Sequence, residues 1–178
     1  MTGIISAWLG PSGACSTAPV IFNGCASNHT SCHVLFESDG TAYVSGQLCG
    51  NTAPLSTTVT YGIVRRDPDG TLVHVAGRPA GMTTDGVLAT QALIGGAGWL
   101  ARDASGALHY TDFGSHRLRR IDPASGMVST IAGTGTAGFS GEYVTSIAAQ
   151  LNLPWGIVFS GGHLFLADTT NVAVRVIW

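Results

Sequence analysis

The chain has 178 residues, a formal net charge of −2 and only 10% charged residues. Nucleic-acid binding needs a strongly basic surface, so this balance argues against a nucleic-acid partner. No apolar run approaches the roughly 18 residues that a membrane span needs, so no membrane span is expected. The apolar fraction of 45% is enough for a core, and the 25 glycines stand between short apolar runs, as turns do in all-β chains.

Four cysteines lie in the first third of the chain, at Cys15, Cys25, Cys32 and Cys49. They form no CxxC pair, so the spacing does not indicate a zinc site, and four cysteines allow three disulfide pairings. A hairpin turn at residues 38–41 would place Cys32 near residue 47, close to Cys49. This geometry favours a Cys32–Cys49 bridge and leaves Cys15 to pair with Cys25.

Asn28-His29-Thr30 is an N-glycosylation sequon close to these cysteines. Disulfides belong to oxidising compartments, so the combination predicts an extracellular or secreted glycoprotein. The N-terminus lacks a basic region before its short apolar stretch and does not read as a signal peptide; a mature chain without its signal fits. The alternative is four buried thiols and a chance sequon.

The dominant pattern is an internal repeat with a shift of 56 residues. Residues 106–121, GALHYTDFGSHRLRRI, align without a gap with residues 162–177, GHLFLADTTNVAVRVI. Residues 69–77, DGTLVHVAG, match residues 125–133, SGMVSTIAG, at the same shift. The gapless repeat also pairs Trp99 with Trp155.

Each repeat unit contains four short apolar or β-branched runs separated by Gly, Pro, Asp or Ser. This pattern predicts four strands joined by short turns and paired antiparallel. Four-stranded units at such a spacing are typical of β-propeller blades. We therefore predict an all-β, single propeller segment over residues 1–178, with blade 1 at 33–77, blade 2 at 98–133 and blade 3 at 154–178.

Two stretches carry a resemblance to a known family, TDFGSHRLRRIDPASGMVSTIAGTGTAGFSG and AAQLNLPWGIVFSGGHLFLADTTNVAVRVI. They resemble NHL repeats, in which a strand ending in Asp precedes an Asn-His-Arg-like element. Residues 115–117 fill that element in the second unit, and residues 171–173 fill it in the third without the His and Arg. The resemblance is best over residues 98–178 and weakest over residues 1–60.

The ends of the chain suggest an open arc of about three blades. Residues 2–13, TGIISAWLGPSG, align with the fourth strand of blade 2, so residues 1–13 are predicted to be a closing strand, and blade 3 lacks its own fourth strand. Propellers usually have at least four blades. We expect two chains to join head to tail into a six-bladed ring in which each N-terminal strand completes the partner's last blade. The alternative is a segment of a longer propeller protein.

Long loops on a rigid scaffold usually carry binding, and here the long loops share one face with the loops between second and third strands. That face is the predicted binding surface. Its residues are Phe113, Ser115, His116, Phe139, Ser140, Glu142, Tyr143, Thr169, Thr170 and Asn171. Trp99 and Trp155 begin the inner strands near it, where blade-to-blade packing is the simpler role.

Residues that recur in every unit are predicted to be structural. Arg119 and Arg175 occupy one repeat position, where they would bond a carboxylate or carbonyl and pack their stems. Asp112 and Asp168 occupy another, where they would accept backbone N–H bonds in the following turn. No histidine pattern or nucleophile motif supports a metal, a cofactor or a catalytic residue.

These observations predict a non-enzymatic NHL-type propeller module for protein–protein binding or extracellular structural assembly. Its partner is expected to be another protein or a second copy, in a homodimer or larger assembly. The resemblance also admits RNA binding, which the charge balance opposes. Related six-bladed propellers include lyases and hydrolases, so the alternative is a metal-dependent lyase or hydrolase with a site in the central channel.

Overall fold

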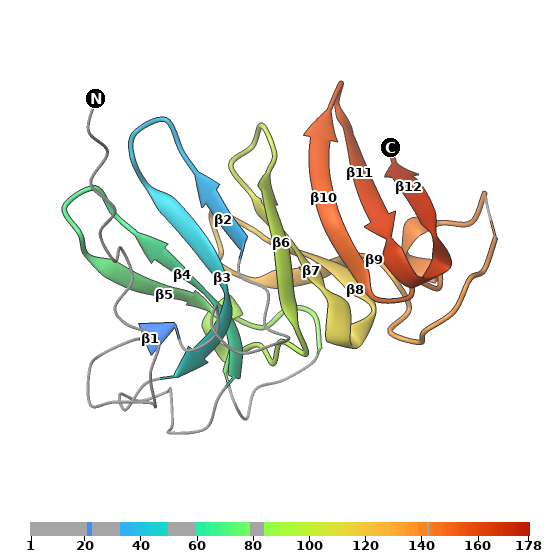
Figure 1. The fold of residues 1–178 in the computed structure, drawn as a ribbon, viewed down its shortest axis with the longest axis horizontal. Coiled ribbons are helices and arrows are strands. Elements are labelled where there is room, and N and C mark those ends of the chain that lie inside the picture. Colours follow the sequence, from blue (N-terminus) through green and yellow to red (C-terminus); the bar gives the residue numbers. More distant parts are fainter. Residues whose placement is uncertain (1–20, 23–32, 50–59, 79–83, 142) are drawn as a thin grey trace, which may run out of the picture.

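The computed structural model describes residues 21–22, 33–49, 60–78, 84–141 and 143–178 (Figure 1). Several predictions concern residues outside these ranges, namely the closing strand at residues 1–13, Cys15, Cys25, Cys32, Asn28 and Glu142. Cys49 ends a strand, but its side chain is outside the described part. The disulfide pairing and the glycosylation therefore stay predictions.

The described chain is all-β, with antiparallel sheets and only short 3-10 helices, as predicted. The first sheet contains β1 (Ile21–Phe22), β2 (His33–Phe36), β3 (Ala42–Cys49), β4 (Thr60–Arg66) and β5 (Leu72–Ala76). The second contains β6 (Ala97–Arg102), β7 (Leu108–Asp112), β8 (Arg117–Ile121) and β9 (Val128–Ala132). The third contains β10 (Pro154–Ser160), β11 (His163–Asp168) and β12 (Ala173–Ile177). The 3-10 helices are η1 (Ala89–Gln91), η2 (Phe113–Ser115), η3 (Ser146–Ala148) and η4 (Thr169–Asn171).

The three sheets stand side by side in chain order, with the first and third at opposite ends (Figure 1). In the second and third sheets, consecutive strands are neighbours. The inner strand β6 contacts β2 and β3 on one side and β10 on the other. This arrangement of twisted antiparallel sheets around adjacent inner strands is propeller-like.

The second sheet is buried on both faces because it lies between the other two. All five residues of β7 are buried, whereas burial alternates along the equivalent strand β11. Leu100 and Tyr110 belong to the core shared with the first sheet, and Leu118 belongs to the core shared with the third. The third sheet has one buried face and one open face within the described chain.

Side-chain hydroxyls link neighbouring sheets. Thr111 accepts a hydrogen bond from Trp99 N at 2.8 Å and donates one to Trp155 O at 2.8 Å. Ser45 of the first sheet donates likewise to Gly98 O. In the third sheet, Ala167 stands at the position of Thr111 and carries no hydroxyl. One position of the second strand thus links the first sheet to the second, through Ser45, and the second sheet to the third, through Thr111.

The hairpin between β2 and β3 corrects the predicted register by one residue. Gly40 adopts φ 91° and closes a three-residue turn, in which Glu37 N donates to Thr41 O at 2.8 Å. A left-handed glycine at the end of such a turn is a common hairpin geometry. His33 consequently lies opposite Ser45, whereas the predicted register would place it opposite residue 46.

The inner strand β10 departs from the gapless repeat for a similar reason. Two residues separate the paired Ser160 and His163, whereas three separate Asp103 and Ala107 in the second sheet. The shorter turn shifts β10 by one residue against β6. Trp155 therefore takes the place of Gly98, and the predicted equivalence of Trp155 with Trp99 is wrong.

The backbone of Val172 is strained, so its replacement by glycine should stabilise the protein. It has φ 52° and is 93% exposed, although the left-handed region disfavours β-branched residues. We expect Val172→Gly to raise the free energy of unfolding by about 1 kcal/mol, because the side chain contributes little packing to offset the strain. Urea denaturation of the two proteins measures the change. Val172→Ala, which keeps a Cβ at the same φ, should recover only part of it.

Candidate binding surface

Two buried aspartates tie the long loops to the sheets. Asp112 accepts a hydrogen bond from Gly96 N at 3.0 Å, and Asp168 accepts one from Asn152 N at 2.7 Å. Both donors lie in the loop that enters the inner strand of the same sheet, because the last residue of the second strand faces the start of the first. The expected partner, an N–H in the following turn, is therefore replaced by one in the incoming loop. Burial raises the pKa of Asp112.

Two arginines, Arg119 and Arg175, also bind the long loops that precede the second and third sheets. Arg119 is 1% exposed and donates to Asp85 at 3.0 Å, and Asp85 also accepts Thr130 N at 2.9 Å. Arg175 donates to Gly141 O at 2.8 Å and pairs with Asp168 at 3.3 Å. Each arginine therefore anchors the long loop that precedes its own sheet.

The polar residues of the predicted surface mostly hold the loops in place. Ser115 Oγ donates to Asp112 O at 3.3 Å, and His116 Nδ1 accepts a hydrogen bond from Leu153 N at 3.1 Å. Asn171 Nδ2 donates to Gly138 O at 2.7 Å and to Asp168 at 2.8 Å. Thr169 and Thr170 belong to η4, and both are exposed. These contacts leave less hydrogen-bonding capacity for a ligand than the sequence pattern implied.

An aromatic row crosses the three sheets on this face. The ring of Phe113 lies 5.6 Å from Tyr61, edge to face, and 5.0 Å from Trp155. Nearby, Trp99 stacks on His33 at 4.2 Å and is 39% exposed. Burial lowers the pKa of His33, which favours its neutral ring. Sequence reasoning named Phe113 and the tryptophans but missed Tyr61, because it stands in the least regular unit.

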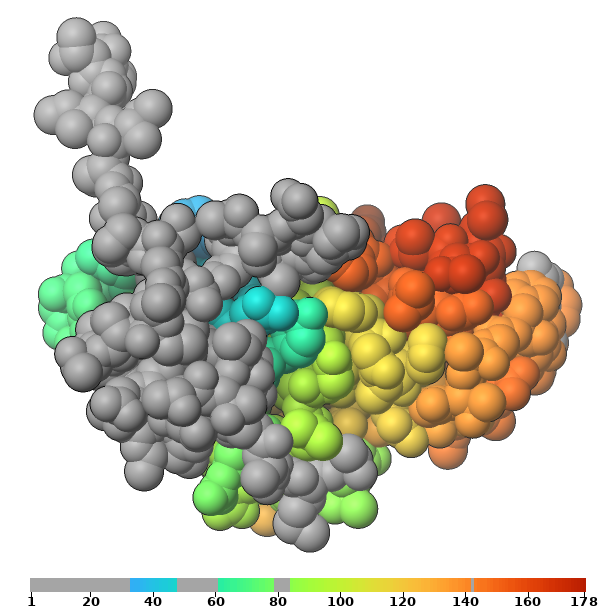
Figure 2. All heavy atoms as spheres, turned by 60° about the horizontal axis from the view of Figure 1, so that its bottom comes forward, coloured from blue at the N-terminus to red at the C-terminus, as the bar shows by residue number. Residues whose placement is uncertain are grey.

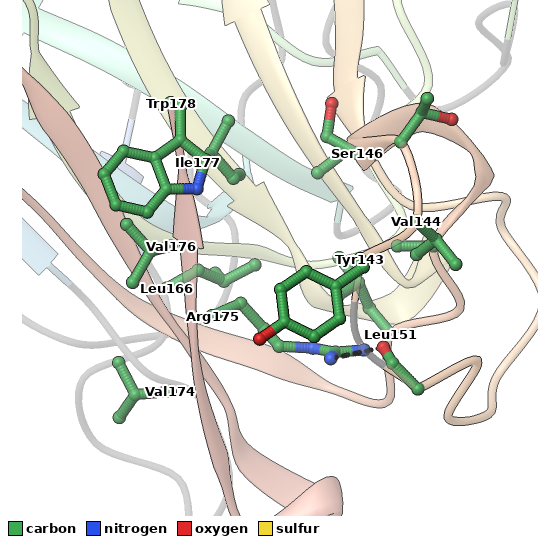
Figure 3. A pocket seen from close by; sticks show the side chains of 14 residues that line it. Tyr143, Val144, Ser146, Leu151, Leu166, Val174, Arg175, Val176, Ile177 and Trp178 are labelled. Atoms are coloured by element: carbon green, nitrogen blue, oxygen red, sulfur yellow. Dashed lines mark hydrogen bonds between the residues drawn. The ribbon is translucent and has the colours of Figure 1, made fainter.

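A hollow of about 620 Å³ lies along the free side of β12 (Figure 3). Tyr143, Val144 and Ser146 line it on the loop side and Val174, Val176 and Trp178 on the strand side, with Leu166 and Arg175 between. Phe139, another predicted surface residue, is 53% exposed and lies 4.6 Å beneath the Arg175 guanidinium. The structure thus brings Phe139 and Tyr143 to the third sheet, where both lie near Arg175.

The open face of the third sheet is apolar. Val158 faces Phe165, and Phe165 faces Val176, so three apolar side chains form a row across β10, β11 and β12. Val158 is 56% exposed and Val174, on the same face, is 71% exposed. Figure 2 shows the third sheet, in red, at one end of the molecule.

The second sheet carries a more polar row on the face that is covered. Ala101, His109 and Arg120 stand where Val158, Phe165 and Val176 stand in the third sheet. His109 is 5% exposed, hydrogen-bonds Asp103 at 2.9 Å and packs edge-on against Phe159. Burial lowers the pKa of His109. The open face is therefore the more apolar of the two. The sequence signal that could have revealed it is the stretch AVRVIW, residues 173–178, in which Arg175 is the one polar residue.

The described ranges contain neither a cluster of metal-binding side chains nor a helix that could span a membrane. No three His, Cys, Asp or Glu side chains there come close enough together to hold a metal ion. No helix in that part of the chain has the length and apolar character needed to cross a membrane.

No family model matches the chain. Over 73 residues, 40% of its length, it is 41% identical to "Protein SUPPRESSOR OF QUENCHING 1, chloroplastic" from Arabidopsis thaliana. It spans only 7% of that protein, so the similarity concerns a small part of a much longer chain.

Two solved structures are similar in fold. One is a structural genomics protein of unknown function from Bacteroides thetaiotaomicron, with TM-score 0.58, 21% identity and coverage of 80% of this chain and 46% of that chain. The other is an auxiliary nutrient binding protein from Bacteroides ovatus, with TM-score 0.58 and 21% identity. The match covers 86% of this chain and 38% of that chain. Both are propeller-like, and this chain spans less than half of each.

Proposed function

We propose that the chain is a non-enzymatic NHL-type propeller module for protein–protein binding, and that the open face of the third sheet is its contact surface. The row of Val158, Phe165 and Val176 carries this proposal. Exposed strands normally place polar residues toward water, and a contiguous exposed apolar face marks an interaction site.

The second sheet indicates what covers such a face. Leu118 is fully buried because the third sheet packs over it, whereas its repeat equivalent, Val174, is 71% exposed. A further propeller sheet packed in the same way would bury Val174 and the apolar row. The preferred partner is therefore another sheet of this architecture.

A second copy of the chain supplies such a sheet. Two copies joined head to tail would contribute six sheets, and a heterologous contact of this kind closes when the rotation between sheets permits. This chain spans less than half of each propeller-like structure above, which fits a ring with more sheets than one copy supplies. In the alternative arrangement the further sheets belong to the same polypeptide in a longer chain.

The loop face is proposed as a second contact region, with Phe139 and Tyr143 as its exposed aromatic residues. One of the fold neighbours is an auxiliary nutrient binding protein, which supports a binding role in general terms. The cysteines and the sequon support an exported location, and the relative from Arabidopsis thaliana is named as chloroplastic.

The test is the solution mass of the full chain, measured by light scattering after size exclusion. The formula mass is 18.2 kDa, and we expect about twice that value. Val158→Glu should weaken the association about 100-fold or more, because it buries an unpaired carboxylate in an apolar contact. At micromolar concentration this variant should be a monomer.

Val172→Glu is the matched control, since Val172 is also an exposed valine but lies in a loop outside the apolar row. It should keep the mass of the original protein. A cooperative, soluble monomer for the original chain, or equal masses for Val158→Glu and the original, would contradict the proposal.

A further inference from the structure

The outer edge of β12 is unpaired within the described chain. In the second sheet, the equivalent edge of β8 is paired with β9, and Arg119 lies opposite Thr130 in that pairing. No described strand takes the corresponding place beside β12. An open edge of this kind accepts an added strand through its backbone N–H and C=O groups.

The hollow beside β12 lies where a fourth strand of the third sheet would bind, and we call it the strand seat. In the second sheet, β9 lies between β8 and the loop before η1, where Gly86 N donates to Val128 O at 2.8 Å and Val128 N donates to Val87 O at 2.9 Å. In the third sheet, the loop before η3 lies across the hollow from β12, with Tyr143 and Val144 facing the strand (Figure 3). The seat therefore has the same two walls as the place that β9 fills.

A buried polar atom also lines this seat. Arg175 Nη2 is buried and has no hydrogen-bond acceptor among the described residues, although Arg175 lines the hollow. In the second sheet, Asp85 binds both Arg119 and Thr130 and so joins the arginine to the fourth strand. Gly141 stands 56 residues after Asp85 and provides no carboxylate. A strand seated beside β12 would bring backbone carbonyl groups to the unsatisfied guanidinium.

The sequence contains one segment that matches β9 and lies outside the described residues. TGIISAWLG, residues 2–10, aligns with SGMVSTIAG, residues 125–133, and shares the two glycines and the central serine. Ile5 takes the place of Val128, which is 1% exposed in the second sheet. The segment therefore supplies both the length and the apolar pattern that the seat requires.

We propose that residues 4–9 of a second copy bind in this hollow as an antiparallel strand on β12, with Ser6 opposite Val176. This register copies the pairing of Ser129 with Arg120 in the second sheet. The inference rests on the proposed head-to-tail association, because that arrangement sets the first sheet of one copy beside the third sheet of the other. Within one chain, those two sheets lie at opposite ends (Figure 1).

Disulfide trapping between two differently labelled proteins tests the register. One protein carries Ser6→Cys and the other, labelled with ¹⁵N, carries Val176→Cys. After mixing, exchange and mild oxidation, peptide mapping should find position 6 of one copy joined to position 176 of the other. The control pairs Ser6→Cys with Val172→Cys, because Val172 lies just before β12 and about 13 Å of extended chain separates it from Val176. We expect at least tenfold less cross-linking in the control.

The outcomes separate this inference from the proposed function. The mass of the original chain is measured in the same buffer. A mass near twice the formula mass without the 6–176 cross-link, or with equal cross-linking at 172, would overturn the strand inference alone. A monomeric original chain would overturn both. A double variant that forms the 6–176 bridge within one monomer would show that the chain's own segment fills the seat, and would also overturn the inference.

Discussion

Gly133→Ala is expected to lower the free energy of unfolding by about 3 kcal/mol, which is a large share of the stability of an ordinary domain. Gly133 has φ 97°, a conformation that costs an alanine about 1–2 kcal/mol. A Cβ at this position would also overlap the backbone carbonyl oxygen of His116, which cannot move aside as a flexible side chain could. The added strain and the overlap act together.

The glycine sits where β9 gives way to the long loop that leads to the third sheet. Gly133 N donates to Ser146 O at 3.0 Å, and this hydrogen bond folds the loop back against the end of β9. The close approach of Gly133 to His116 is part of the same loop conformation. Gly77 occupies the same place after β5 and would meet Tyr61 O in the same way. Loss of this geometry should therefore loosen the loop that lines the hollow.

Gly86→Ala is the matched control. Gly86 has φ 78°, also in the left-handed region, but nothing lies within 4 Å of an added Cβ. This variant should lose about 1 kcal/mol, the cost of the backbone conformation alone. Urea denaturation of both variants gives the comparison. Equal losses for Gly133→Ala and Gly86→Ala would show that the backbone overlap is relieved without cost.

Asp168→Ala is expected to be about as destabilising, at about 3 kcal/mol. Asp168 is fully buried and accepts hydrogen bonds from Asn152 N at 2.7 Å and Asn171 Nδ2 at 2.8 Å, besides pairing with Arg175 at 3.3 Å. Alanine would leave these donors without their acceptor, and the Arg175 side chain is only 14% exposed. A buried charge that loses its partner costs more than the pair contributes.

Asp67→Ala provides the surface comparison. Asp67 pairs with Arg65 at 2.6 Å, but these side chains are 27% and 37% exposed, and such pairs contribute about 0.5 kcal/mol. Hydrogen exchange should also show faster exchange at Asn152 N in Asp168→Ala and no change there in Asp67→Ala. A loss below 1 kcal/mol for Asp168→Ala would mean that water or neighbouring groups satisfy the freed donors.

The recurring residues show how far sequence reasoning reaches into the site. The 56-residue repeat identified the positions of Asp112, Asp168, Arg119 and Arg175, and their recurrence indicated contacts made within each unit. It could not identify the partners, because Gly96, Asn152, Asp85 and Gly141 lie in loops whose sequences differ between units. Hydrogen bonds to backbone groups leave no pattern in the sequence.

Small changes in turn length also escaped the sequence. One residue fewer between β10 and β11 moves Trp155 from the position of Trp99 to that of Gly98, and Gly40 shifts the register of β2 against β3. Because neighbouring strand residues point to opposite faces, a one-residue shift changes which side chains share a face. The aromatic row of Tyr61, Phe113 and Trp155 depends on such a shift.

The all-β class and the antiparallel pairing could be predicted from the sequence, because alternation of apolar and polar residues between turn residues is a local property of the chain. Which face of each sheet is covered could not be predicted in this way, because it depends on how the sheets pack in three dimensions. The second sheet has neighbours on both sides, whereas Val158 and Val174 of the third face outward. Burial depends on what packs against a residue, and the repeat that makes the sheets alike in sequence cannot record that their surroundings differ.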